Sequence, residues 1–386
     1  MRQNAIRSVF MRGGTSKALI FHVDDLPSDR ADWADIFLGA MGSPDPYSRQ
    51  LDGMGGGISS LSKVCVVGPP SRADADVDYT FCQVSPRDAQ VDYAGNCGNM
   101  TSAIGPFAVD EGLVDVVADG LTTVRIHNTN TNKIIRSTFK VCDGRAEVDG
   151  NLRLDGVAGS GSPIKLDFLD PGGARTGHLF PTGNLIDVLD PGNVSPVEAS
   201  LVDASNPTIF VRAADFGLTG VELPSEIYAV PGLLETLETL RRLGAVKMGL
   251  ATNPQEAGDH ASQPKIALLS SPTQAELISG RMVEASEQEI QCRMISMGQT
   301  HLAIPITGAL CLAVACRVSG TIAEQCATQG SSDGVRIGHP SGVLIADAKI
   351  DGSADCPLVI SATVFRTARR LFEGSVFYRH TRTGDQ

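Results

Sequence analysis

A single cysteine between two Gly-Asn dipeptides is the strongest candidate for chemistry in this sequence. Cys97 lies in the segment 95–99, and the apolar residues from Met100 onward are typical of a buried helix. A thiol at a helix N-terminus faces unpaired N–H groups and the positive end of the helix dipole, and both favour the reactive thiolate. The same N–H groups could hold the carboxylate of a substrate. The alternative is a small buried cysteine in a glycine-rich turn.

Lys63 is the second candidate. It follows a loop with four glycines in the five positions 53–57, and it begins an apolar run. So much glycine lets a backbone approach a ligand closely. Partial burial at the start of a strand would favour the neutral amine, which is a competent base. A solvated lysine at a strand start is the alternative.

Two other polar turns could contribute to a site. The segment 11–17 lies between two apolar runs but lacks the spacing of a phosphate-binding loop, so a glycine-rich hairpin with exposed cations is its alternative. The segment 338–342 contains His339, which could bind a carboxylate or transfer a proton. A lone histidine in a turn usually does neither, and the same holds for His301.

Composition narrows the possible partners. The chain has 386 residues, which favours two domains, and a net charge of −12 at pH 7, which disfavours nucleic acid but allows a small acidic ligand. No apolar signal core or run of about 18 apolar residues occurs, so no membrane partner is expected. The nine cysteines form no Cys-x-x-Cys pair and the seven histidines are scattered, which predicts a reducing cytoplasm and no metal site.

The elements that must position these residues are mostly strands. Short apolar runs bounded by Gly, Pro, Asp or Asn predict strands at 6–11, 18–23, 63–67, 78–84, 122–127, 134–141, 208–212, 265–269, 290–295 and 358–365. Helices are expected at 32–41 and at 233–243, the latter with Gly244 as its C-cap.

Two further helices are apolar on every side, which indicates complete burial. One follows Cys97 and the other spans 308–317, and each comes after strands and a turn of small residues. This repeat predicts an α+β fold of two similar domains, each with a curled sheet around one buried helix. Glycine and proline concentrate at 171–183, which places the domains at 1–180 and 181–365. The segment 366–386 could supply a strand that completes the first domain.

Seven segments in this order resemble the methylaconitate cis–trans isomerase (PrpF-type) family, which includes 4-oxalomesaconate tautomerases, methylitaconate Δ-isomerases and aconitate isomerases. The resemblance runs from about residue 6 to the C-terminus, and the ordered set is specific although each motif alone is weak. The segments are Met11-Arg12-Gly13-Gly14-Thr15-Ser16-Lys17, Ser59-Ser60-Leu61-Ser62-Lys63, Gly95-Asn96-Cys97-Gly98-Asn99, Asn206-Pro207, Met248-Gly249, Gly338-His339-Pro340-Ser341-Gly342 and Ala368-Arg369-Arg370-Leu371-Phe372-Glu373-Gly374.

The resemblance implies a diaminopimelate epimerase-like fold with a cofactor-free active site in the cleft between two similar domains. Diaminopimelate epimerases use two cysteines, one at the start of each central helix. Cys97 matches the first position, but Thr307-Gly308 at the second position holds no cysteine, and Cys311 comes about one turn later. The isomerase family instead pairs a lysine with the first cysteine, which corresponds to Lys63 and Cys97.

The implied reaction is a 1,3-proton shift that moves a double bond, with or without cis–trans isomerisation, in 2-methylaconitate, aconitate, 4-oxalomesaconate or a similar unsaturated acid. Lys63 is the expected base, and Cys97 handles the second proton or orients the substrate. No flavin, nicotinamide, pyridoxal phosphate or other cofactor is expected, and the chain could form a homo-oligomer. The residues expected to bind the substrate are Arg12, Ser16, Lys17, Ser59, Ser60, Asn96, Gly98, Asn99, Thr307, Gly308, His339 and Ser341.

Two other functions stay open at this stage. An amino-acid racemase or epimerase on the same fold would need a second thiol or another group that reaches the opposite face of one carbon. A non-catalytic polycarboxylate-binding protein would keep the anion-binding loops without requiring Lys63 or Cys97.

Overall fold

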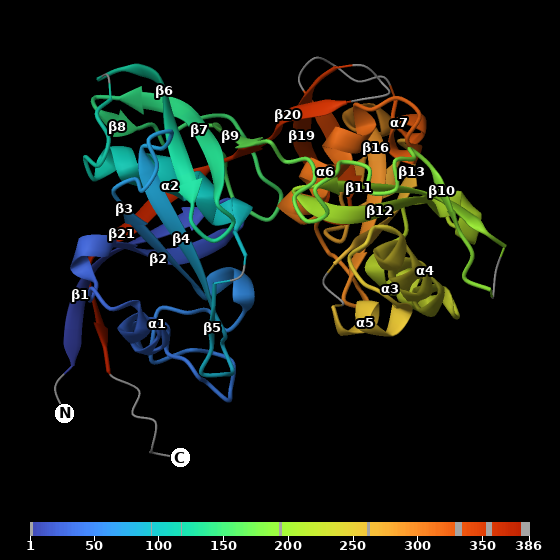
Figure 1. Cartoon of the computed structure of the whole chain (residues 1–386). Helices are drawn as coiled ribbons and strands as arrows, with labels where there is room; N and C mark the ends of the chain where they lie inside the picture. Colours follow the sequence, from blue (N-terminus) through green and yellow to red (C-terminus); the bar gives the residue numbers. More distant parts are fainter. Residues whose placement is uncertain are drawn as a thin grey trace. The chain divides into compact units, whose positions relative to one another are not determined.

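The computed structural model describes residues 3–93, 95–116, 118–192, 195–260, 263–328, 334–352 and 357–379. Its chain divides into two compact units (Figure 1). Unit 1 comprises Met1–Asp167 and Phe365–Gln386, and unit 2 comprises Phe168–Val364. The predicted division into domains at 1–180 and 181–365 stays a prediction.

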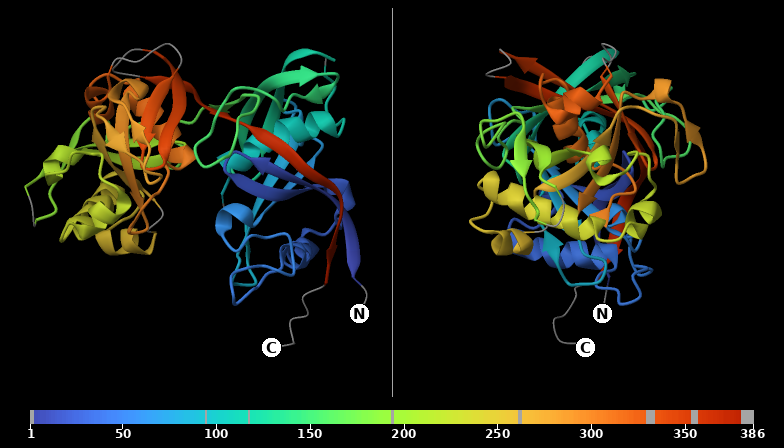
Figure 2. Two further views of the ribbon diagram at one scale, coloured as in Figure 1. Left: turned by 180° about the vertical axis from the view of Figure 1, so that it is seen from behind. Right: turned by 90° about the vertical axis from the view of Figure 1, so that its right-hand side faces the viewer.

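Unit 1 is built on a curled sheet that encloses helix α2 (Gly98–Asp110), with helix α1 (Trp33–Met41) packed outside it (Figure 1). The last strand of the chain pairs antiparallel with the first, and Figure 2 shows the two side by side in red and blue. The strands are β1 (Asn4–Gly13), β2 (Ser16–His22), β3 (Lys63–Gly68), β4 (Val77–Val84), β5 (Val91–Asp92), β6 (Gly120–Asn128), β7 (Lys133–Cys142), β8 (Arg145–Ala146), β9 (Ile164–Leu169, which ends in unit 2) and β21 (Ala368–Tyr378).

Unit 2 encloses helix α6 (Ile306–Cys316) in the same manner, and α4 (Leu233–Lys247) packs on the other side of its strands. Its remaining helices are α3 (Pro224–Ala229), α5 (Pro254–Asp259) and α7 (Ile322–Cys326). Its strands are β10 (Asp187–Leu189), β11 (Val197–Ala204), β12 (Asn206–Arg212), β13 (Lys265–Ser270), β14 (Ala275–Glu276), β15 (Met282–Val283), β16 (Ile290–Ser296), β17 (Gln299–Thr300), β18 (Val335–His339), β19 (Gly342–Asp351) and β20 (Leu358–Arg366, which ends in unit 1).

The two units repeat one order of elements. An antiparallel hairpin, β1–β2 or β11–β12, is followed by at least one helix and then by a parallel strand, β3 or β13. An antiparallel strand, β4 or β16, and a short one, β5 or β17, lead to the central helix, α2 or α6. The repeat in organisation that the sequence predicts is therefore confirmed, as are the two apolar helices.

Side-chain alternation gives β3 two distinct faces. Val64 and Val66 belong to the apolar cluster that contains α1, so Lys63 and Cys65 lie on the opposite face, the side of α2. The position of Lys63 relative to α2 is thus set by the register of one strand.

One prediction about a helix end was wrong. Helix α4 does not end at Gly244 but continues to Lys247, and Met248 is its C-cap. A Cβ at position 244 would lie 2.2 Å from Cδ1 of Ile209 on β12, so the glycine is required by close packing of helix on strand and not by a left-handed cap.

None of the helices in the described ranges combines the length and apolar character that crossing a membrane requires.

Candidate active site

Lys63 carries a buried amine with neutral partners. Only 7% of the residue is exposed. Its Nζ donates a hydrogen bond to Oε1 of Gln83, its register partner on β4, at 2.5 Å, and lies 5.0 Å from the ring centre of Phe81. An amide oxygen and an aromatic face both stabilise the charged amine less than a carboxylate would. Among the described residues, the contacts that hold the amine in place are thus an amide oxygen and an aromatic ring.

The amide of Gln83 is itself oriented by the glycine-rich loop. Its Nε2 donates to the carbonyl oxygens of Ser59 and Ser62, each at 3.0 Å, so Oε1 must point to the lysine. Ser59 also opens a short 3₁₀ turn, Ser59–Leu61. Gln83 thus joins the loop to the lysine, a role that the sequence did not reveal.

A second glutamine, Gln50, holds the glycine-rich loop through hydrogen bonds. Gln50 is 1% exposed, and its Oε1 accepts hydrogen bonds from the N–H of Gly57 at 2.8 Å and the hydroxyl of Ser62 at 2.6 Å. A Cβ at Gly55 would lie 2.3 Å from this amide. Position 55 therefore requires glycine because the backbone there packs directly on Gln50.

Cys97 is the N-cap residue of α2 and is half-buried. Its carbonyl oxygen accepts hydrogen bonds from the N–H of Thr101 at 2.9 Å and from the Thr101 hydroxyl at 3.0 Å. The hydroxyl also lies 3.2 Å from Oδ1 of Asn96. Helix capping through the backbone leaves the thiol available for other contacts.

Lys63 and Cys97 both interact electrostatically with one buried thiol, that of Cys65. Burial raises the pKa of Cys65 far above its ordinary value, the charge of Cys97 raises this pKa further, and the charge of Lys63 lowers it. Lys63 and Cys65 share the face of β3 that contacts α2, and Cys97 is the N-cap of this helix. The structure therefore brings the predicted lysine and cysteine into one neighbourhood of unit 1.

The β1–β2 turn packs against the first turn of α2 through Asn99. Oδ1 of Asn99 accepts hydrogen bonds from the N–H of Thr15 at 3.4 Å and from Nε of Arg366 at 3.3 Å, and its Nδ2 donates to the Thr15 hydroxyl at 3.1 Å. Gly14 has φ +52°, and a Cβ there would lie 2.2 Å from Oδ1 of Asn99. Only glycine permits this contact.

Arg366 is a site candidate that the sequence reading missed. It is 6% exposed, and burial lowers its pKa to about 10, so it is still a cation at neutral pH. Its hydrogen bonds go to Asn99 and to the carbonyl oxygen of Phe365, and no carboxylate of the described residues forms an ion pair with it. A buried cation without an anionic partner is costly, which suits it to the carboxylate of a ligand. The sequence signal for this residue was its position directly after the apolar run 358–365.

Other predicted residues of unit 1 lie on different faces of its sheet, some on the side of α2 and some on the side of α1. Arg12 braces the turn, because its Nη1 donates to the carbonyl oxygens of Gly14 at 2.9 Å and Thr367 at 3.0 Å. Lys17 lies on the opposite face of the sheet from Lys63, with Nζ 5.5 Å from the ring centre of Phe10. The neighbour of Lys17 on β2, Ser16, is buried on the side of α2. Lys17 is therefore not brought together with Lys63.

The predicted residues of unit 2 are described within that unit. Thr307 and Gly308 form the first turn of α6. His339 is buried, its Nδ1 accepts a hydrogen bond from the N–H of Ser341 at 3.2 Å, and the Ser341 hydroxyl donates to the carbonyl oxygen of Leu302 at 2.6 Å. A joint site with unit 1 stays a prediction.

Cys311 is a packing residue. Burial raises its pKa to about 12, and its Sγ lies 3.5 Å from the carbonyl oxygen of Val202. The thiol that an epimerase would need in the second half is thus neither at the helix start nor in a reactive setting.

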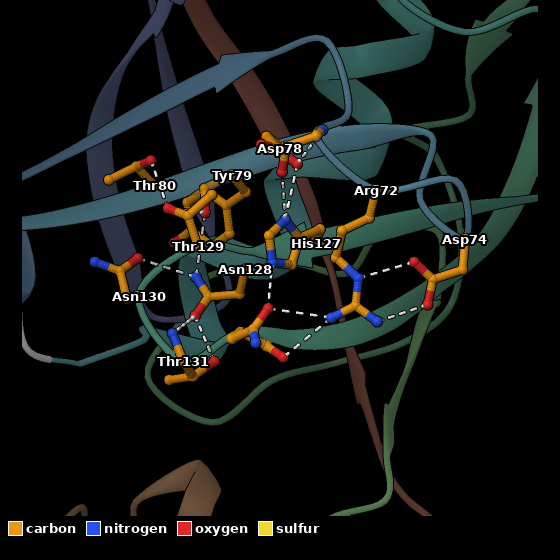
Figure 3. Close-up of polar contacts among 12 residues, drawn as sticks. Arg72, Asp74, Asp78, Tyr79, Thr80, His127, Asn128, Thr129, Asn130 and Thr131 are labelled. Carbon is orange, nitrogen blue, oxygen red and sulfur yellow. Dashed lines mark hydrogen bonds and ion pairs between the residues drawn. The ribbon is translucent and has the colours of Figure 1, made fainter.

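A serine, a histidine and an aspartate also meet in unit 1, but not as a nucleophilic triad. Ser71 Oγ and Asp78 Oδ1 lie 3.3 Å and 2.9 Å from the same nitrogen, Nδ1 of His127, whereas a triad needs them on opposite nitrogens. Nε2 of His127 contacts Asn132 at 3.0 Å, and Figure 3 shows how this network ties the β6–β7 turn to β4.

The same turn helps to position the site. Nδ2 of Asn130 donates to the carbonyl oxygens of Phe81, at 2.9 Å, and Tyr93, at 2.7 Å. Phe81 lies under the Lys63 amine, and Tyr93 precedes the Cys97 loop. Asn130 therefore links the strand beneath the lysine to the chain that leads to the cysteine.

Within the described ranges, no three His, Cys, Asp or Glu side chains are grouped so as to hold a metal ion.

One buried helix enclosed by a curled sheet in each unit is the diaminopimelate epimerase-like fold that was expected. The chain belongs to the family described as PrpF protein, whose model matches residues 3–379. The predicted family and fold are both confirmed.

Named relatives cover almost the whole chain. It is 40% identical to a 3-methylitaconate isomerase of Eubacterium barkeri and 38% identical to a 2-methyl-aconitate isomerase of Shewanella oneidensis, with 97% of each chain covered in both cases. It is 36% identical to a 4-oxalomesaconate tautomerase of Pseudomonas putida, again over 97% of both chains. A solved structure of a methylitaconate-delta-isomerase superposes with a TM-score of 0.90 at 40% identity, covering 98% of this chain and 96% of that one. The predicted class, an isomerase, is confirmed by these relatives.

Thiol accessibility gives a direct test of the Cys97 environment. We expect iodoacetamide to modify Cys142 and Cys97 in the native protein, because Cys142 is exposed and Cys97 is partly exposed at the N-terminus of α2. Cys316 is partly exposed as a residue, but it should stay unmodified, since desolvation of its thiol raises the pKa and its Sγ lies 3.9 Å from the carbonyl oxygen of Ala323. Mass spectrometry of peptides measures each site.

Denatured protein is the control, in which every thiol should react. Cys142 is the internal reference in the native protein, and Cys356 lies outside the described residues. If Cys142 reacts while Cys97 does not, Cys97 is a packing residue.

Proposed function

We propose that this protein catalyses a cofactor-independent 1,3-proton shift that moves the double bond of an unsaturated di- or tricarboxylate, such as 2-methylaconitate, aconitate or 4-oxalomesaconate. The observation that carries the proposal is that Lys63 lies on the face of β3 that contacts α2, the helix that Cys97 caps. The names of the relatives support the same chemistry, because they are a methylitaconate isomerase, a methyl-aconitate isomerase and an oxalomesaconate tautomerase.

Lys63 is the proposed base. Its neutral amine removes a proton from an allylic carbon of the substrate, and the charge spreads into a dienolate. Gln83 accepts a hydrogen bond from the amine, which keeps the nitrogen in place before and after proton transfer. Positioned proton transfer contributes about 10²–10⁴-fold to a rate.

Cys97 is the proposed second proton-transfer group. It returns a proton to the far carbon of the dienolate or orients the substrate for that transfer. The N-terminus of α2 begins at this residue, and its N–H groups and dipole favour the negative charge that develops on the dienolate. The shift moves protons only, so it requires no redox cofactor.

The remaining proposed residues hold carboxylates. Arg366, supported by Asn99, is a buried cation at the start of α2, and its guanidinium geometry suits a carboxylate. The proposed set is completed by residues of both units, which are Arg12, Ser16, Ser59, Ser60, Asn96 and Gly98 of unit 1 and Thr307, Gly308, His339 and Ser341 of unit 2.

The proposed location of the protein is a reducing cytoplasm, which the free cysteines of the described chain support.

Deuterium exchange tests the reaction and the base together. In D₂O we expect the wild-type protein to place deuterium at an allylic position of cis-aconitate, 2-methylaconitate or 4-oxalomesaconate, and Lys63→Met to abolish this exchange. Mass spectrometry and NMR of the recovered acids measure it. Lys140→Met is the control, because Lys140 is an exposed lysine paired with Glu147.

Three results would contradict this prediction in different ways. Exchange in Lys63→Met at a rate near that of the wild type removes Lys63 from the mechanism. Exchange only at the α-carbon of an amino acid supports a racemase. Tight binding of the unsaturated acids without any exchange supports a binding protein.

Replacing the cysteine should be nearly as damaging. Cys97→Ser keeps the size of the side chain but raises the cost of giving up its proton, so we expect turnover to fall by about 10²–10⁴-fold. Steady-state rates measured by ultraviolet absorbance test this. Cys142→Ser, at an exposed thiol, should leave the rate unchanged, and a loss below about tenfold in Cys97→Ser would contradict a proton-transfer role.

Removing the buried arginine should weaken substrate binding. Arg366→Met deletes a charged hydrogen-bond donor worth about 1.5–3 kcal/mol, so kcat/KM should fall by about 10–100-fold, mainly through KM. Arg366→Lys keeps the charge and should recover part of the loss. The exposed neighbour Arg369→Met is the control. Unchanged KM in a folded Arg366→Met variant would contradict the role.

A further inference from the structure

A second lysine occupies, in unit 2, the place that Lys63 has in unit 1. Lys63 opens β3 and pairs in parallel register with Ala18, the third residue of β2. Lys265 opens β13 and pairs in parallel register with Thr208, the third residue of β12. The two lysines are therefore equivalent in the repeated order of strands.

Lys265 also lies on the equivalent face. Its neighbours Ile266 and Leu268 belong to the apolar cluster of α4, just as Val64 and Val66 belong to the cluster of α1. Alternation along β13 places Lys265 on the opposite face from α4, as Lys63 is placed opposite α1. Lys265 is half-buried there, and this burial lowers its pKa.

The antiparallel strand opposite supplies a polar partner in both units. Gln83 of β4 accepts a hydrogen bond from Lys63, and Ser296 of β16 accepts one from Nζ of Lys265 at 3.2 Å. In unit 2 the partner is a hydroxyl, which can also donate a hydrogen bond to a ligand.

His301 adds a ring nitrogen that lacks a hydrogen-bond partner among the described residues. The backbone N–H of His301 donates a hydrogen bond to the carbonyl oxygen of Met294 on β16 at 2.8 Å, which fixes the residue beside this strand. Burial, and then the charge of nearby Lys265, lower the pKa of His301 to about 4, so the ring is neutral at neutral pH. Its Nε2 is buried and makes no hydrogen bond to the described residues. Buried polar atoms normally have partners, so this nitrogen points to a ligand.

We propose that Lys265, Ser296 and His301 form a carboxylate-binding site in unit 2. The lysine ammonium supplies the charge, and the serine hydroxyl and the Nε2–H tautomer of the histidine supply two neutral donors for the carboxylate oxygens. The ligand is a small di- or tricarboxylate, and only this choice of ligand rests on the proposed isomerase function.

Calorimetry with tricarballylate tests the site without turnover, because this saturated tricarboxylate has no double bond to move. We expect Lys265→Met to weaken its binding by about tenfold or more, and Lys265→Arg to stay within about threefold of the wild type. His301→Phe and Ser296→Ala should each weaken binding by about three- to tenfold, because each removes one neutral donor. Lys349→Met, at an exposed lysine of β19, is the matched control.

Unchanged binding in Lys265→Met, or a wild-type protein that binds no tricarballylate, would overturn the site. If Lys265→Met melts well below the wild type, His301→Phe and Ser296→Ala decide, and unchanged binding in both overturns it. The outcome is separate from that of the isomerase proposal. Lys265-dependent binding in a protein that shows no deuterium exchange contradicts the proposed reaction and leaves the site standing.

Discussion

The hydrogen bond between Lys63 and Gln83 is the contact on which the proposed active site depends. A buried amine needs a partner, and a carboxylate in that position would hold it as ammonium and remove its basicity. The amide accepts a hydrogen bond without imposing a charge. Because Ser59 and Ser62 fix the direction of that amide, the glycine-rich loop, the lysine and strand β4 form one connected unit.

At the start of α2, close approach of the backbone holds the site residues in place. Gly14 sits against Asn99, and Asn99 in turn contacts Arg366, which follows it by 267 positions in the sequence. Chain segments from both ends of the protein thereby place a cation beside a helix N-terminus. The net charge of −12 does not oppose this, because a few buried cations set the local field where an anion would bind.

The sequence predicted what depends on local pattern and missed what depends on register. Strands bounded by turn residues and two helices apolar on every side were predicted correctly, and the glycine-rich loops drew attention to Lys63 and Cys97. Gln50 and Gln83 have no local signal, and Arg366 has only its place at the end of an apolar run, since their roles come from strand pairing or from contacts across the chain. Lys17 was grouped with its motif, but alternation along β2 puts it on the other face. These site assignments remain predictions, whereas the family and the fold are confirmed.

The two halves of the chain repeat the lysine but not the thiol. Lys63 and Lys265 hold the same register position, whereas α6 begins without a cysteine and Cys311 is a buried packing residue. Inversion at one carbon requires two matched proton-transfer groups, one for each face. A 1,3-shift instead requires a base and an acid that serve two different carbons, together with cations that hold the carboxylates. Two lysines and one thiol at the start of a central helix are the groups that the proposed 1,3-shift would use.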